Sequence, residues 1–103
     1  MLTSKQRAKL KAVASKTDAL YQLGSKGIND NYITQINSAL DANEIVKIHI
    51  LDNNFDDRGA IAAELAGRTD SEVVQVIGSK LVLYKKSRRP EKRKLSLEID
   101  KIK

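Results

Sequence analysis

Residues 45–51 have the sequence Ile45-Val46-Lys47-Ile48-His49-Ile50-Leu51, in which apolar and polar side chains alternate. Val46, Ile48 and Ile50 fall on one face of an extended chain, and Lys47 and His49 fall on the opposite face. This alternation predicts a β-strand that is buried on one side. The segments before and after it complete the predicted fold.

A first helix is predicted for residues 3–15. Thr3 and Gln6 have the spacing of a capping box, which begins a helix. An interior-facing stripe at helical spacing follows it, formed by Leu2, Gln6, Leu10 and Val13. Residues 18–23 form a short apolar run that stops at Gly24, and they suit a first strand.

A second helix is predicted between the loop 24–27 and the strand 45–51. Asn29 or Asp30 can cap its start, and Asn43 can end it. Its apolar positions keep a spacing of three to four residues, at Ile33, Ile36 and Leu40. These features are typical of an amphipathic helix packed against a sheet.

A third helix and a hairpin are predicted after residue 55. Asp56 or Asp57 can begin the helix, which buries Ile61 and Leu65 and ends near residues 67–69. Residues 73–77 and 81–85 are β-branched, apolar runs. Gly78-Ser79 joins them and provides glycine where a type II′ turn needs a positive φ.

The predicted fold is therefore α/β, with the element order αβαβαββ and a mixed four-stranded sheet. Right-handed crossovers place the second and third helices on one face of this sheet. We expect one domain over residues 1–86 and a basic C-terminal tail over residues 87–103. In the tail, Leu95, Leu97 and Ile99 alternate like a strand, whereas Leu95, Ile99 and Ile102 keep helical spacing, so its structure stays open.

The net charge of +6 is concentrated at the two ends of the chain. Residues 1–16 carry five basic and no acidic residues, which gives a net charge of +5. Residues 17–85 carry six basic and ten acidic residues (−4), and residues 86–103 carry eight basic and three acidic residues (+5). Clustered Lys and Arg displace counterions from a phosphate backbone, so this distribution indicates a polyanionic partner. A solubilising surface with a disordered basic tail has the same composition, and composition alone does not separate the two.

Several other classes of function have little support. The chain has no cysteine, which excludes disulfides and thiolate chemistry and fits the cytoplasm. No segment suits an export signal or a membrane span. His49 is the only histidine, and the aspartates 52, 56 and 57 are explained by helix capping. We expect no enzyme, no metal, no cofactor and no small-molecule substrate.

The loop Gly24-Ser25-Lys26-Gly27 leaves a predicted strand and leads into a helix. Its backbone N–H groups and the positive helix end are suited to phosphate. Loops of this Gly-x-x-Gly form clamp backbone nucleotides in KH modules. The tetrapeptide by itself is weak evidence, because strand-to-helix connections often contain glycines simply to make the turn. Its spacing matches neither a Walker loop nor a dinucleotide fingerprint.

The order and spacing of four stretches are more specific than any one of them. The stretches are Leu2-Thr3-Ser4-Lys5-Gln6-Arg7, Leu23-Gly24-Ser25-Lys26-Gly27-Ile28, the strand 45–51, and Val73-Val74-Gln75-Val76-Ile77-Gly78 with Leu81-Val82-Leu83-Tyr84. Together they resemble the CRM domain (chloroplast RNA splicing and ribosome maturation) in its stand-alone bacterial form, the YhbY-like proteins. The resemblance covers residues 1 to about 86.

The resemblance implies a fold similar to the C-terminal domain of bacterial translation initiation factor three. It also implies RNA binding, with ribosomal RNA in precursors of the large ribosomal subunit as the partner and ribosome assembly as the role. By position, Gly24 to Gly27 match the RNA-contacting loop of the family, and the basic residues of the first helix match its positively charged surface. We expect a monomer that binds no membrane.

The expected RNA-binding residues combine the loop with basic residues from both ends of the chain. They are Gly24, Ser25, Lys26, Gly27, Lys5, Arg7, Lys9, Lys11, Lys16, Lys47, Lys80, Lys85, Lys86, Arg88 and Arg89. The chain has only four aromatic residues, which favours recognition by backbone and shape over a stacking platform. The alternative is a protein–protein adaptor in a ribosomal or regulatory complex, whose binding would survive removal of the loop lysine and the charged ends.

Overall fold

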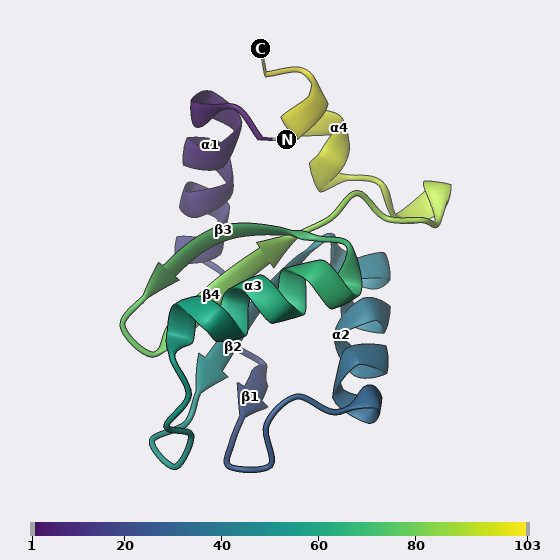
Figure 1. Ribbon diagram of the computed structural model, residues 1–103. Coiled ribbons are helices and arrows are strands. Elements are labelled where there is room, and N and C mark those ends of the chain that lie inside the picture. Colours follow the sequence, from purple (N-terminus) through teal and green to yellow (C-terminus); the bar gives the residue numbers. More distant parts are fainter. Residues whose placement is uncertain (1, 103) are drawn as a thin grey trace.

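The computed structural model describes residues 2–102, and Figure 1 shows a sheet with helices on both faces. The strands are β1 (Tyr21–Leu23), β2 (Ile45–Ile50), β3 (Glu72–Ile77) and β4 (Lys80–Tyr84), in the spatial order β1-β2-β4-β3. β1 pairs with β2 in parallel, and β4 pairs antiparallel with both β2 and β3. The predicted mixed four-stranded α/β sheet is therefore confirmed.

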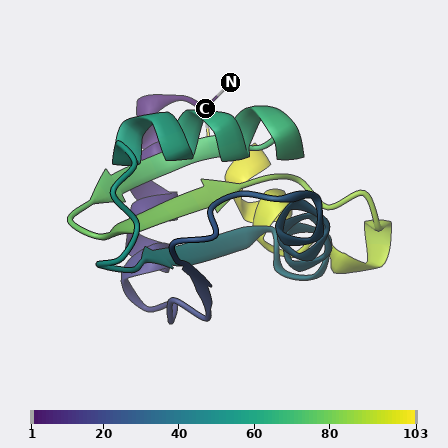
Figure 2. The same ribbon diagram turned by 60° about the horizontal axis from the view of Figure 1, so that its bottom comes forward.

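The helices α2 (Asp30–Asn43) and α3 (Arg58–Thr69) cover one face of the sheet, as Figure 2 shows from a second side. Asn29 and Asp57 are their N-caps, each accepting a hydrogen bond from a backbone N–H in the first turn. The main core lies between these helices and the sheet. It contains the predicted inward side chains, Val46, Ile48, Ile50, Ile36, Leu40, Ile61 and Leu65.

The helices α1 (Ser4–Ser15) and α4 (Leu95–Asp100) lie side by side at one end of the molecule and pack on the opposite face (Figure 1). Thr3 and Gln6 form the predicted capping box at the start of α1. A second, smaller core joins the two helices to the sheet, and it contains Leu10, Ala14, Ile45, Val74, Val82, Tyr84 and Ile99. The fold is thus a sheet with a hydrophobic core on each side.

Residues 87–102, for which a basic tail is expected from the sequence, are folded and pack against the rest of the chain. A 3-10 turn, η1 (Pro90–Lys92), leads into α4, and Ile99 is buried in the second core. Helical spacing is the correct alternative for this segment, since Leu95 and Ile102 pack against the same core while Leu97 is 58% exposed. Lys103 of the predicted tail lies outside the described residues.

Glu44 attaches this C-terminal segment to the body of the domain. The residue ends α2 in the left-handed conformation, with φ 66°, and its side chain is fully buried. Its carboxylate accepts hydrogen bonds from the backbone N–H groups of Ser87 (2.8 Å) and Ser96 (3.0 Å). A buried carboxylate costs free energy unless it is hydrogen-bonded, and these two donors supply its partners.

The strand β1 and the β3–β4 turn differ in how closely they match the sequence-based expectation. β1 contains only three residues instead of the predicted six, and Leu20 before it is 76% exposed. The β3–β4 hairpin turns at Gly78-Ser79, where Gly78 has φ 57° and Ser79 is not among the residues with positive φ. Positive φ at the first turn position alone is the pattern of the predicted type II′ turn.

Candidate nucleic-acid interface

The loop Gly24–Gly27 is a closed turn at the carboxyl end of β1. The N–H of Gly27 donates to the carbonyl of Gly24 over 3.1 Å. Gly27 has φ 69°, a conformation that L side chains rarely adopt, whereas Gly24 needs no such φ. A methyl group on Gly24 would meet the Asn53 Oδ1 at 3.4 Å, so the fold itself tolerates a small side chain there. Only Gly27 is required by the turn.

Asn54 holds this turn against the β2–α3 connection. Its Nδ2 donates to the carbonyl of Gly24 over 2.9 Å, and its Oδ1 accepts from the N–H of Asp56 over 2.9 Å. The side chain is nearly buried, unlike most of its neighbours in the connection. No spacing in the sequence marks Asn54 as a functional residue, because it is one polar residue in a polar connection. The hydrogen bonds of Asn54 therefore join the two loops into one edge of the site.

Ser25 and Lys26 form the exposed tip of the turn. Within residues 2–102, neither their backbone N–H groups nor their side chains make a hydrogen bond. The start of α2 is less open than expected, because the Asn29 side chain caps it and Asp30 pairs with Arg68 over 2.8 Å. An anion at this loop would therefore meet the Lys26 ammonium and the turn N–H groups instead of the helix end.

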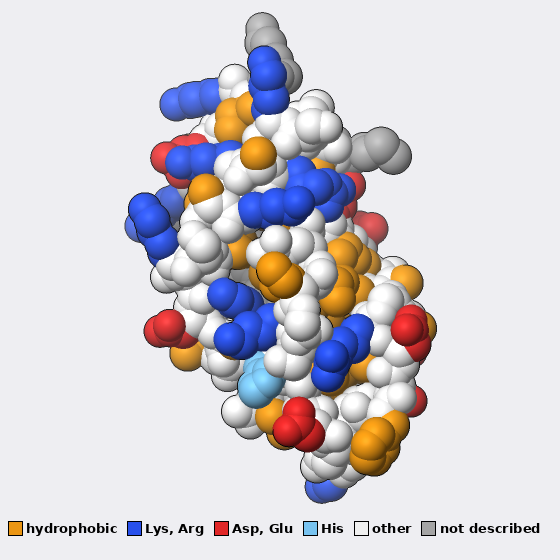
Figure 3. Space-filling view, turned by 90° about the vertical axis from the view of Figure 1, so that its left-hand side faces the viewer, with side chains coloured by type: hydrophobic (Ala, Val, Ile, Leu, Met, Phe, Trp, Pro, Cys, Tyr) orange, Lys and Arg blue, Asp and Glu red, His pale blue; other side chains and the backbone are white. Residues whose placement is uncertain are grey.

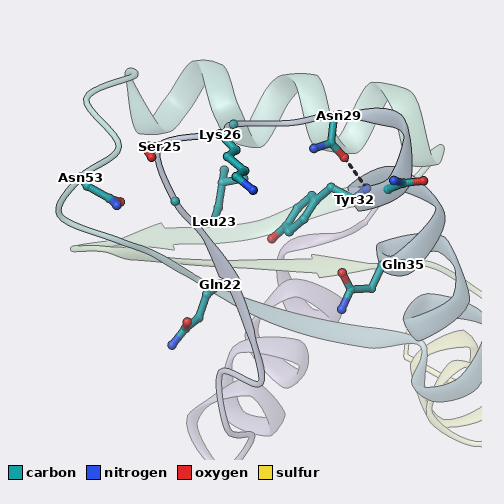
Figure 4. Close-up of a pocket in the computed structure, with 11 residues that line it drawn as sticks. Gln22, Leu23, Ser25, Lys26, Asn29, Tyr32, Gln35 and Asn53 are labelled. Atoms are coloured by element: carbon teal, nitrogen blue, oxygen red, sulfur yellow. Dashed lines mark hydrogen bonds between the residues drawn. The ribbon is translucent and has the colours of Figure 1, made fainter.

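The turn has a neutral side and an acidic side. On the neutral side a pocket of about 410 Å³ lies between the turn, β1 and the first turns of α2 (Figure 4). On the other side a hollow of about 400 Å³ is lined by Asp56, Asp57 and Glu64. Carboxylates repel phosphate, so the neutral side is the favourable approach for a nucleic acid.

Three lysines on α1 and the lysine that caps its C-terminal end are exposed, and their side chains make no ion pair or hydrogen bond within the described part of the chain. They are Lys5, Lys9, Lys11 and Lys16, and Lys80 on β4 shares this property. Figure 3 shows basic side chains along most of the length of the face that carries α1, with acidic side chains mainly near its margins. These predicted residues are free to bind an external anion.

Three other predicted residues have partners inside the fold. Arg7 Nη1 donates to the carbonyls of Val73 and Val74 on β3, the latter over 3.0 Å. Lys47 Nζ donates to the carbonyl of Ala14 (3.1 Å), and Lys85 Nζ to that of Thr69 (3.0 Å). Both carbonyls lie at the C-terminal ends of helices, where a cation is stabilised by the helix dipole. These three residues have structural contacts, and their contact with RNA stays a prediction.

The three predicted residues near the C-terminal segment are also paired. Lys86 binds Asp100 over 2.7 Å, Arg89 binds Glu91 over 3.3 Å, and Arg88 binds both carboxylate oxygens of Asp41, with a shortest distance of 2.6 Å. The hydrogen bonds from Arg88 lower the pKa of Asp41, and the same contact raises the pKa of Arg88. Three of the twelve basic residues that the sequence assigns to RNA are thus paired with carboxylates within the domain.

A comparison with protein families decides the membership of this chain. The model of the CRS1/YhbY (CRM) domain matches residues 2–85. The chain belongs to the CRS1/YhbY (CRM) domain family. The predicted resemblance is confirmed, and the CRM match ends just before the segment that Glu44 attaches to the domain.

Individual CRM relatives support this placement. The chain is 41% identical over 88 residues to the Bacillus subtilis protein named "Probable RNA-binding protein YqeI", an alignment that covers 85% of this chain and 92% of that protein. It is 26% identical over 91 residues to "Probable RNA-binding protein PA4753" of Pseudomonas aeruginosa, covering 88% of each. The solution structure of the hypothetical protein SAV1595 from Staphylococcus aureus matches with a TM-score of 0.74 and 44% identity, over 91% of this chain and 98% of that one.

The described residues contain neither a metal-ligand cluster nor a membrane-spanning helix. Residues 2–102 contain no group of three His, Cys, Asp or Glu side chains arranged to hold a metal ion. None of the helices in this range combines the length and the apolar character needed to cross a membrane.

Proposed function

We propose that the protein binds RNA through the Gly24–Gly27 turn and the free lysines of α1. The observation that supports this most directly is the exposed Lys26 at the tip of the turn, where the backbone N–H groups of Ser25 and Lys26 have no hydrogen-bond partner within residues 2–102. Phosphate oxygens accept hydrogen bonds from backbone N–H groups and from ammonium groups alike. The names of the CRM relatives, which describe them as RNA-binding proteins, support the same function.

The electrostatic contribution comes mainly from the basic residues that no carboxylate neutralises. The basic face extends along the molecule, whose longest dimension is 39 Å, from α1 towards the sheet (Figure 3). If four or five phosphates are neutralised, log K against log salt has a slope of roughly −3 to −4.5. Affinity should therefore fall steeply with salt.

We further propose that the RNA is ribosomal RNA in precursors of the large ribosomal subunit. The support for this step is what the CRM resemblance implies, an association of the family with large-subunit precursors. The protein then acts as a monomer in the cytoplasm during ribosome assembly.

Lys26→Ala tests the RNA contact, and Lys92→Ala is its matched control. Lys92 is exposed and makes no ion pair within the described residues, but it lies in η1, far along the chain from the turn. Removing one phosphate contact should weaken RNA binding and reduce the salt slope by about 0.7 to 0.9, and the control should change neither. Fluorescence anisotropy of labelled RNA at several salt concentrations measures both. Equal effects of the two substitutions would contradict a specific role for the turn.

Sedimentation of a cell lysate through sucrose gradients tests the assembly role. We expect the wild-type protein to migrate with large-subunit precursors at low salt and to dissociate at raised salt. Lys26→Ala should reduce this association, and RNA cross-linking should recover large-subunit ribosomal RNA. Migration only with free proteins, unaffected by salt or by Lys26→Ala, would favour the adaptor alternative.

A further inference from the structure

The pocket on the neutral side of the turn has a rim of side-chain amides. Five of the residues that line it are Gln22 on β1, Asn29 and Asn31 at the start of α2, Gln35 on α2, and Asn53 after β2. All five side chains are exposed. Figure 4 shows Gln35 and Asn53 on opposite sides of the pocket, with Gln22 between them below the turn. The amides of the rim thus come from three separate segments of the chain, namely β1, the N-terminal half of α2 with its cap, and the connection after β2.

These amides are available to a ligand. Gln22, Asn31, Gln35 and Asn53 make no side-chain hydrogen bond within residues 2–102. Asn29 uses its carbonyl oxygen to cap α2 and keeps its amide nitrogen for other partners. Each free amide offers one acceptor and two donors in one plane.

The floor of the pocket is apolar. Leu23 is buried beneath it, and the ring of Tyr32 packs against the main core at its side. The Tyr32 hydroxyl is buried without a hydrogen-bond partner among the described residues, and burial raises its pKa to about 12. The hydroxyl therefore stays neutral at physiological pH and adds no negative charge.

Neutral amides and an apolar floor do not suit a phosphate. Lys26 is the only charged residue among those that line the pocket, and it stands at the turn. A flat heterocycle with donors and acceptors on its edges fits this chemistry, since its faces contact the floor and its edges contact the amides. A nucleobase has these properties, and the adjoining turn can hold the phosphate next to it.

We propose that this pocket binds one unstacked nucleobase of the RNA whose backbone lies on the Gly24–Gly27 turn, and that the base is adenine. The inference rests on the proposed function and narrows its substrate to RNA with an unpaired nucleotide. In an A-form helix the major groove is too narrow for side chains to read the base edges, and sequence-specific recognition of RNA mostly targets unpaired bases. Asn and Gln pair with the N6 and N7 atoms of adenine, whereas guanine is read by Arg or Lys and cytosine by carboxylates. The pocket is lined by no Arg and no carboxylate, and Lys26, its one lysine, stands at the turn, where the proposed phosphate contact lies.

Binding of single-stranded RNA 12-mers tests this proposal. Labelled oligo(A), oligo(C) and oligo(U) and a 12-base-pair duplex are compared by fluorescence anisotropy at two salt concentrations. Oligo(A) should bind roughly tenfold more tightly than oligo(C). Gln35→Ala should reduce that preference to within about twofold and leave the salt slope unchanged. Asn43→Ala removes an exposed amide outside the pocket and should retain the preference.

The outcomes separate the two proposals. Equal affinity for all three homopolymers, or tighter binding of the duplex than of every single strand, would overturn the nucleobase pocket. If Lys26→Ala still weakens binding in that case, the proposed RNA contact at the turn stands. Absence of RNA binding by the wild-type protein would overturn both. Circular dichroism of each variant shows that a loss of preference does not come from unfolding.

Discussion

Replacing Glu44 with glutamine tests how residues 87–102 are held to the domain. The carboxylate of Glu44 is fully buried and accepts one backbone N–H from Ser87 and one from Ser96. Glutamine has the same length but only one acceptor oxygen, so its amide nitrogen must face one of these two N–H groups. One charge-assisted hydrogen bond is lost, and a buried donor is left without a partner.

The expected loss is large for a domain of this size. A hydrogen bond to a charged group contributes about 1.5–3 kcal/mol, and an unsatisfied buried donor costs about 1–3 kcal/mol. We therefore expect Glu44→Gln to lower the free energy of unfolding by about 2–4 kcal/mol. Small domains have total stabilities of about 5–15 kcal/mol. The corresponding decrease in Tm is about 10–25 °C.

The effect of Glu44 should also depend on pH. Burial by itself raises the pKa of Glu44, but hydrogen bonds from Ser96 and Ser87 outweigh it, and the pKa lies below its ordinary value. Because the pKa is lower in the folded state, the carboxylate stabilises the fold above the unfolded pKa of about 4.3, and this stabilisation is lost as pH falls through the folded pKa. The stability difference between wild type and Glu44→Gln should therefore narrow in acid.

Urea denaturation followed by circular dichroism measures the stability change, and amide hydrogen exchange locates it. Exchange should accelerate most in residues 87–102. Asp70→Gly is the control, because Asp70 is the other non-glycine residue with positive φ among those described, at 54°, and it is exposed. Glycine adopts a positive φ without strain, so the free energy of unfolding of this variant should stay within about 1 kcal/mol of wild type. A Glu44→Gln variant within 0.5 kcal/mol of wild type, with unchanged exchange, would refute the reasoning.

Three further predictions concern single side chains. Gly27→Ala should lower the free energy of unfolding by about 1 kcal/mol because residue 27 has a positive φ. Gly24→Ala should leave urea unfolding unchanged, and equal losses of stability in the two variants would contradict the turn geometry. Lys47→Gln should lower the free energy of unfolding by roughly 0.5–1 kcal/mol, because it weakens the hydrogen bond to the Ala14 carbonyl. The salt dependence of RNA binding should stay unchanged, and a smaller slope would assign Lys47 to the RNA contact. Tyr32→Phe should leave thermal stability equal or higher, because the buried hydroxyl has no partner within residues 2–102; a clear drop in Tm would show that it has one.

The sequence by itself determined the order of the elements and the face that each one buries. Alternation in residues 45–51 and three-to-four spacing in α2 depend only on the period of the backbone, which is local. The caps at Thr3, Asn29 and Asp57 are local for the same reason, since a cap and its N–H partner are three residues apart. The loop 24–27 was placed correctly because it lies between two such elements.

Tertiary structure decided the conformation of residues 87–102 and the role of each basic residue. The strand period and the helix period both fit Leu95 to Ile102 in the sequence. The segment is a helix because that conformation packs it against the second core on the far face of the sheet. The partners of Lys47, Lys85 and Glu44 lie between 16 and 52 residues away in the chain, so no local pattern distinguishes them from free lysines and glutamates. Charge can be counted from the sequence, but whether a charge is neutralised inside the fold depends on contacts between distant segments.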